Sequence, residues 1–186
     1  ICKINEKLAA EGNDFRLLSG SEVDILAGGK LDFDDDLLAE LDVVVASIHH
    51  RFSDGEAETT KRLIAAAENP YVHMLGHLTG RLLLFREPYK VNQHAVIDAC
   101  AETGTWIELN ACPERLDMDW RLWHYAKSKG VKCVINCDAH RLESAGFLRL
   151  GAGVARKGWL TKEDVINTLP LPALLRELKA KRNRLR

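Results

Sequence analysis

Polar side chains that could bind a metal ion recur wherever an apolar run of this sequence ends. In chain order they are Glu22, His49, His77, Asn110 and Asp138, and His140 follows two residues after the last. The intervals between successive members are 27, 28, 33 and 28 residues, and a strand–helix–strand unit takes roughly 30 residues. The spacing therefore predicts one such residue per unit, at the exit of each strand. In barrel-like α/β folds this edge is the active-site face.

Imidazole and carboxylate groups form a ligand set that suits Zn, Mn or Fe. An Asp-x-His pair is a weak signal by itself, and most histidines that follow strands are ordinary surface or core residues. Several strand exits with the same kind of residue strengthen the signal. Asp138 and His140 are two residues apart, so in an extended segment both point the same way. A shared carboxylate such as Glu22 could bridge two cations about 3.5–4 Å apart.

Two basic stretches are candidates for contacting a phosphate. Arg81 follows His77 closely, and a guanidinium there could grip a phosphate; an ordinary salt bridge is an equally good explanation. Arg156 and Lys157 stand in a loop with Trp159 and could contact a nucleic-acid backbone. A solvated basic loop is the alternative for that second stretch.

Helices and strands are expected to alternate along the chain, which implies parallel strand pairing with right-handed crossovers. The expected strands are 15–25, 42–49, 71–77, 105–110 and 131–137. The expected helices among them are 1–11, 34–41, 56–68, 91–103 and 118–129. After His140 the pattern weakens, and the expected elements are a helix at 142–147, a short strand near 150–154, a capping box at 161–164 opening a helix to 168, and a last helix from Pro172.

Composition describes a globular chain of 186 residues with 46% apolar residues, 28% charged residues and a net charge of −1. We expect one domain over 1–186, short of the roughly 250 residues of a full barrel. No overall basic field marks a nucleic-acid binder. Five cysteines in an irregular pattern indicate reduced thiols and a cytoplasmic location, and no apolar run approaches the roughly 20 residues of a membrane span. The start without Met, in a helical pattern, predicts a piece of a longer protein.

Five motifs in order resemble the PHP (polymerase and histidinol phosphatase) family; they are the stretches 20–25, 46–49, 69–81, 107–111 and 136–140. The stretches 156–160 and 167–170 are most similar to the C-terminal PHP domain of bacterial family X DNA polymerases. The resemblance implies a distorted (β/α)7 barrel, TIM-like, with a cleft for three metal ions. It also implies an upstream polymerase domain in the parent chain and DNA, as a single strand or a 3′ end, as the substrate.

The resemblance also implies roles for the site residues. Glu22 would bridge two metals, and His49 and His77 would complete one of them. Asp138 would serve a second metal and His140 a third, with Glu22 and Asp138 central to catalysis. The implied activity is Mn- or Zn-dependent phosphoester hydrolysis of the 3′–5′ exonuclease or phosphatase type.

The chain departs from the family in one main respect. Nothing in residues 1–16 matches the family's first His-x-His motif, so we expect the first two barrel strands to be missing. The residues present supply one complete ligand set, and we expect weak activity or none from this piece. His50 and Arg51 after His49, and Leu78 after His77, are smaller departures.

The sequence is also compatible with other functions. A free-standing phosphatase acting on a small phosphomonoester such as histidinol phosphate is the second enzyme hypothesis. An amidohydrolase is more distant, and a non-catalytic PHP module that scaffolds a polymerase is the hypothesis from a different class.

Overall fold

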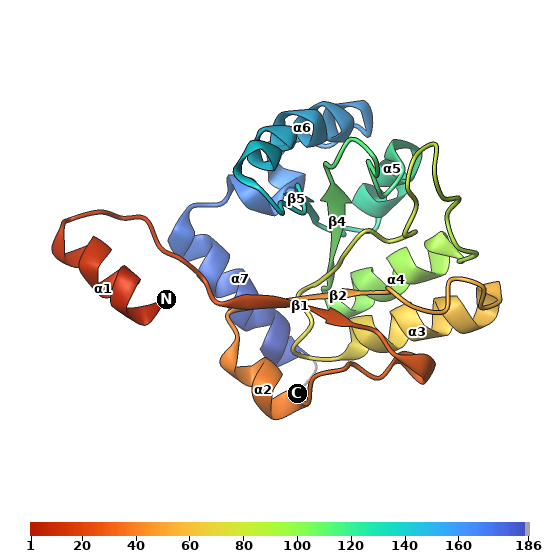
Figure 1. Ribbon diagram of the computed structural model, residues 1–186, viewed down its shortest axis with the longest axis horizontal. Coiled ribbons are helices and arrows are strands. Elements are labelled where there is room, and N and C mark those ends of the chain that lie inside the picture. Colours follow the sequence, from red (N-terminus) through yellow and green to blue (C-terminus); the bar gives the residue numbers. More distant parts are fainter. Residues whose placement is uncertain (185–186) are drawn as a thin grey trace.

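The computed structural model describes residues 1–184 and has an α/β architecture with a parallel sheet. The strands are β1 (Gly20–Asp24), β2 (Val43–Ser47), β3 (Met74–Leu75), β4 (Trp106–Asn110) and β5 (Cys133–Asn136). They lie side by side in the order β1-β2-β3-β4-β5, and every adjacent pair is parallel. This confirms the predicted α/β class and parallel pairing (Figure 1).

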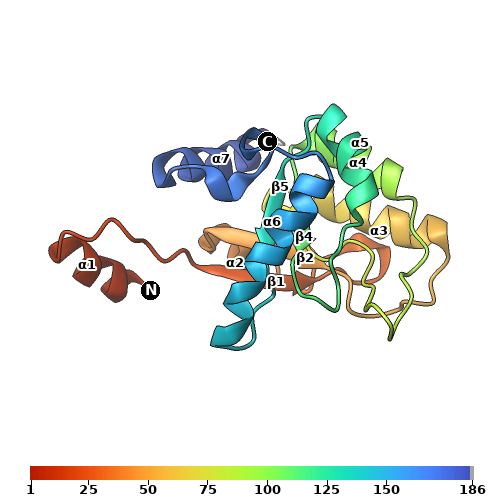
Figure 2. The ribbon, with the colours of Figure 1, turned by 90° about the horizontal axis from the view of Figure 1, so that it is seen from above.

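Helices alternate with the strands from β1 to β5 as expected, one helix precedes β1, and two follow β5. The helices are α1 (Cys2–Ala10), α2 (Asp35–Glu40), α3 (Glu56–Glu68), α4 (Gln93–Thr103), α5 (Trp120–Ser128), α6 (Leu148–Lys157) and α7 (Leu171–Arg184). Short 3₁₀ helices occupy Ala27–Gly29, Leu142–Phe147, Lys162–Asp164 and Ile166–Thr168. In both views α1 stands apart from the sheet, at the end of an extended segment (Figures 1 and 2).

Local sequence explains where the central helices begin and end. Glu56 and Glu58 lie in the first turn of α3, where negative carboxylates interact favourably with the positive end of the helix dipole. The helix ends before Pro70, which disfavours helix in the residue that precedes it. Asn92 caps α4 by accepting a hydrogen bond from the Ala95 N–H at 3.1 Å. The boundaries of α3 therefore coincide with the predicted 56–68.

The sheet packs against helices on both faces. On one face, small and aliphatic strand residues join the larger core with residues of α3, α4 and α5; they are Val44, Ala46, Leu75, Ile107 and Leu109. On the other face Met74, Trp106 and Val134 pack with Leu178 of α7. His73 ties α7 to the sheet, because its Nδ1 accepts the Val44 N–H at 3.1 Å and its Nε2 lies 3.3 Å from the Leu178 carbonyl oxygen.

Several predicted elements differ in the structure, among them the expected helix 142–147, which is a 3₁₀ helix. Strand β3 keeps only two residues of the expected 71–77. The expected strand near 150–154 is wrong, since these residues lie within α6. Gly151 in this helix packs closely against other elements: a Cβ there would lie 2.4 Å from Ile135 Cγ2 and 2.8 Å from Ala111 Cβ. The capping box of Thr161 and Asp164 is present, although it opens a 3₁₀ turn rather than an α-helix.

Candidate metal centre

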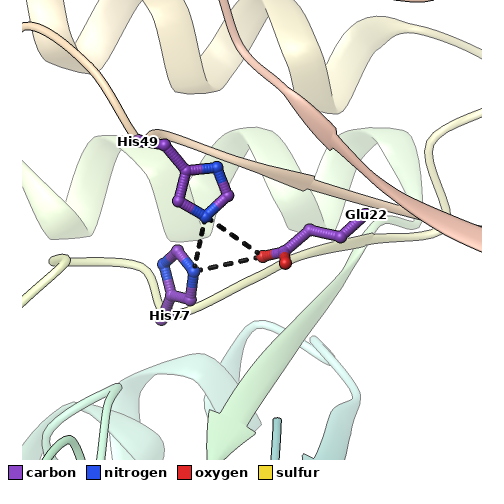
Figure 3. Close-up of side chains that lie close together, drawn as sticks. All are labelled: Glu22, His49 and His77. Carbon is purple, nitrogen blue, oxygen red and sulfur yellow. Dashed lines mark hydrogen bonds and ion pairs between the residues drawn. The ribbon is translucent and has the colours of Figure 1, made fainter. Parts of the chain in front are cut away.

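Glu22, His49 and His77 bring one ligand atom each to a common point (Figure 3). His77 Nε2 lies 3.1 Å from Glu22 Oε1, and His49 Nε2 lies 3.5 Å from the same oxygen. The two Nε2 atoms are 3.2 Å apart. Glu22 comes from the middle of β1, whereas His49 and His77 each follow the end of a strand by two residues. Adjacent parallel strands thus deliver the three side chains to one edge of the sheet.

The geometry of the three atoms fits a metal ion. Zinc bonds to nitrogen and oxygen are about 2.0–2.2 Å long, and in a tetrahedral site two ligand atoms are then roughly 3.3–3.5 Å apart. The observed separations of 3.1, 3.2 and 3.5 Å lie close to that value. Two imidazole nitrogens facing each other across such a short gap need a proton or a cation between them. The donor set is therefore a fit for one divalent transition metal.

Asp24 fixes the orientation of His49. Its Oδ1 lies 2.5 Å from His49 Nδ1, and its Oδ2 lies 2.9 Å from His50 Nε2. A carboxylate that accepts the Nδ1–H leaves Nε2 as the free ligand atom, which is the usual arrangement around metal-binding histidines. Hydrogen bonding to Glu22 raises the pKa of His49 to about 9, with further support from Asp24. Conversely, the hydrogen bonds from His49 and His77 hold the pKa of Glu22 well below its usual range.

The backbone around His77 is shaped for the site. His77 has a φ of 20°, which is uncommon for a residue with a side chain, and its side chain is 3% exposed. The preceding residue, Gly76, has no room for a side chain, because a Cβ there would lie 2.3 Å from Ser47 Oγ and 3.0 Å from Val45 Cγ1. The His77 N–H donates to Glu108 Oε2 at 2.6 Å, so this carboxylate holds the unusual turn in place.

Glu108 is a site residue that the sequence reasoning missed. Besides the His77 N–H, it accepts hydrogen bonds from Asn110 Nδ2 at 3.2 Å and Asn136 Nδ2 at 3.0 Å. Its side chain is buried, and burial raises its pKa. A possible signal was its position two residues before Asn110, which places both on the same face of one strand.

Asp138 lies beside the cluster rather than within it. A cleft of about 330 Å³ runs from Glu22 to Asp138; its lining residues are Glu22, Val45, Glu108, Asn136, Cys137, Asp138 and Ala139. Asp138 Oδ2 lies 3.6 Å from Arg115 Nε and 3.4 Å from Asn110 Nδ2. The cleft thus places the carboxylates of Glu22, Glu108 and Asp138 along one surface.

His140 lies next to Asp138, with its Nδ1 3.7 Å from Asp138 Oδ1, although the segment between them is not extended. Asp138 has a φ of 51°, in the left-handed region, so the alternation of an extended chain does not apply. The side chain of His140 is 86% exposed, and its Nδ1 lies 2.8 Å from the Asp138 carbonyl oxygen. Roles for Asp138 and His140 at further metals remain predictions.

The predicted phosphate-binding residues lie outside the cleft. Arg81 donates to the carbonyl oxygens of Arg115 and Leu116 and pairs with Asp119 at 3.2 Å, so it ties the loop before α5 to the loop after His77. Arg156 and Lys157 form the exposed last turn of α6. Their phosphate contacts stay predictions.

Comparison with known proteins gives relatives of two kinds, although no family model matches the chain. Over 166 residues the chain is 43% identical to the DNA polymerase/3'-5' exonuclease PolX of Bacillus subtilis (strain 168), a match that covers 89% of this chain and 29% of PolX. Over 162 residues it is 31% identical to a probable phosphatase of Thermoanaerobacter sp. (strain X514), covering 82% of this chain and 64% of that protein. Over 136 residues it is 32% identical to a probable phosphatase of Clostridium acetobutylicum, covering 68% and 53%.

The chain thus spans less than two thirds of each of these relatives. Within residues 1–184, no helix combines the length and the apolar character that crossing a bilayer requires. The relatives agree with the resemblance that the five motifs indicated, and the chain belongs to the PHP family.

Proposed function

We propose that this chain is a metal-dependent phosphoesterase domain of a bacterial family X DNA polymerase. In this proposal residues 1–186 form one domain, a distorted (β/α)7 barrel without its first two strands, and the parent chain contributes a polymerase domain upstream. The substrate is DNA, as a single strand or a 3′ end. The observation that carries the proposal is the convergence of Glu22, His49 and His77 at the mouth of a cleft lined by carboxylates.

Each residue has a definite part in this chemistry. Glu22, His49 and His77 would hold one Mn or Zn ion. Asp24 accepts the Nδ1–H of His49, so that Nε2 is the atom that faces the ion. A bound ion would supply Lewis-acid chemistry for phosphoester hydrolysis. Glu108 holds the His77 turn, and Asp138 lies along the cleft where further cations of a complete domain would be bound.

A phosphomonoesterase of the histidinol-phosphatase type is the second candidate. The observation that favours it is the name shared by several relatives, which are probable phosphatases. The two candidates differ in substrate rather than in metal chemistry. Release of nucleotides from a labelled single strand supports the first, whereas hydrolysis of a small phosphomonoester without cleavage of DNA supports the second.

The test uses this chain and its longer parent side by side with added Mn. We expect the parent to hydrolyse a labelled single strand, and Glu22→Ala or Asp138→Ala to abolish hydrolysis while sparing polymerase activity. The 186-residue chain should be weak or inactive, because it supplies one complete ligand set. Glu68→Ala, at the exposed end of α3, is the matched control and should change nothing. Strong cleavage by the short chain that survives Glu22→Ala would refute the assignment.

A further inference from the structure

The end of α6 has an unusual residue at its left-handed position. The Trp159 N–H donates to the Arg156 carbonyl at 3.1 Å, and the Leu160 N–H donates to the Ala155 carbonyl at 3.0 Å. This pair of bonds is the Schellman motif that closes many helices, and its left-handed residue is usually glycine. Here that residue is Trp159, with a φ of 64°. Any side chain with a Cβ is strained in this conformation.

Packing explains the neighbouring glycine but not the tryptophan. A Cβ on Gly158 would lie 2.8 Å from Trp123 Cβ and 3.1 Å from the Trp120 carbonyl oxygen, so glycine is needed at that position. The Trp159 side chain, in contrast, is 71% exposed. Its ring has an edge contact with His124, at 6.2 Å between centroids. A large apolar side chain is thus held in a strained, exposed position with little burial to offset the strain.

Two cationic residues, Arg156 and Lys157, closely precede this tryptophan in the chain. Lys157 Nζ lies 4.5 Å from the ring centroid of Trp120, a second indole that is 36% exposed. Within the described part of the chain, neither Arg156 nor Lys157 has a carboxylate partner. We call Trp120, His124, Arg156, Lys157 and Trp159 the Trp159 platform.

Two carboxylates of the neighbouring segments are already engaged by other cations. Asp119 pairs with Arg121 at 2.9 Å, and Asp164 pairs with Lys127 at 2.7 Å. The two unpaired cations of the platform therefore leave it locally positive, although the whole chain has a net charge of −1.

Exposed aromatic rings beside unpaired cations are the chemistry of single-strand recognition, in which bases stack on the rings and phosphates meet the cations. We propose that the Trp159 platform binds single-stranded nucleic acid, with a base on Trp159 and phosphates on Arg156 and Lys157. The choice of nucleic acid over an acidic protein rests on the proposed function. The platform is distinct from the metal centre, because the cleft beside Glu22 is lined by other residues.

The test is binding of a fluorescein-labelled 20-nucleotide oligo-dT to the 186-residue chain, measured by anisotropy in EDTA so that no metal chemistry contributes. Trp159→Gly should weaken binding about tenfold or more, as loss of one stacked base does. Its thermal midpoint should not fall, because glycine relieves the backbone strain. Leu84→Gly is the matched control: Leu84 is also left-handed, with a φ of 69°, and is fully exposed in another loop. That variant should bind as the wild type does.

Two further variants sharpen the result. Trp159→Phe should retain most of the affinity, since a smaller ring still stacks. Replacing both Arg156 and Lys157 by Gln should reduce the slope of log affinity against log salt by about 1.4, because each phosphate contact on a single strand contributes about 0.7.

The proposal is overturned if the wild type does not bind the oligonucleotide, or if Trp159→Gly binds it equally well. A fall in thermal midpoint that accompanies the loss of binding would make Trp159 a structural residue. Equal binding of poly-glutamate, with the same sensitivity to Trp159→Gly, would indicate a protein partner instead. Failure of the phosphoesterase assignment would leave this binding result unchanged, and loss of the platform should leave hydrolysis of a small phosphomonoester unchanged.

Discussion

Metal binding at the Glu22, His49 and His77 cluster should depend on pH through His49. The side chain lies between two carboxylates, Glu22 and Asp24, and hydrogen bonding to Glu22 is the main reason that its pKa is raised to about 9. At pH 7 without metal, His49 is therefore protonated. A metal ion binds neutral imidazole, so binding at pH 7 must displace this proton.

The size of the effect follows from the gap between pH 7 and a pKa of about 9. Each pH unit below the pKa costs a factor of about ten in apparent affinity, so the gap sets an upper limit of about a hundredfold. The His49 side chain is 35% exposed, and solvent screening weakens its ion pairs, so we expect a loss between about ten- and a hundredfold. Glu22 does not add to this dependence, because its lowered pKa keeps it ionised.

The assay is calorimetry with Mn²⁺ between pH 6 and 9, repeated at pH 7 in two buffers of different ionisation enthalpy. Affinity should rise with pH and level off near 9, with close to one proton released per ion at pH 7. Asp24→Asn removes one of the carboxylates, so affinity should level off at a lower pH and fewer protons should be released. An affinity that is flat from pH 7 to 9, with no proton released, would refute the reasoning.

Four further predictions concern single residues. His77→Ala should remove most metal affinity in the same calorimetric assay, since two remaining ligands rarely hold a cation specifically; equal binding would contradict this. Glu108→Gln should lower metal affinity about 10- to 100-fold with an unchanged circular dichroism spectrum, because the amide cannot accept from all three donors around it. Gly76→Ala should lower stability to urea by about 1–3 kcal/mol through its clash with Ser47, whereas Gly153→Ala, with open space around its Cβ, should not destabilise. Burial lowers the pKa of His73 from 6.5 to about 4. The neutral ring should therefore contribute stability that is present above pH 6.5 and is lost, by up to about 3 kcal/mol, as the pH falls to 4. NMR should find the ring neutral at pH 5.

The order of elements and most of the candidate ligands could be predicted from sequence because they depend on local signals. Buried parallel strands need short apolar runs, and capping residues mark helix ends, so α3 appears at the predicted residues. The recurrence of polar residues at strand exits likewise pointed to His49 and His77. The fold brings them together with Glu22, which lies in the middle of β1 rather than at the predicted exit.

What only the tertiary structure decided depends on residues far apart in the chain. Residue 151 of α6 is glycine because a Cβ there would clash with Ile135 and Ala111, and no local pattern records that contact. Asp138 takes a left-handed backbone that an alternating strand pattern does not predict, and His140 beyond it is largely exposed. Glu108 reads as an ordinary strand residue until the fold places the His77 N–H against its carboxylate. The sequence by itself thus determined which residue types reach the edge of the sheet, whereas the contacts between distant segments determined which of them meet and how each one is oriented.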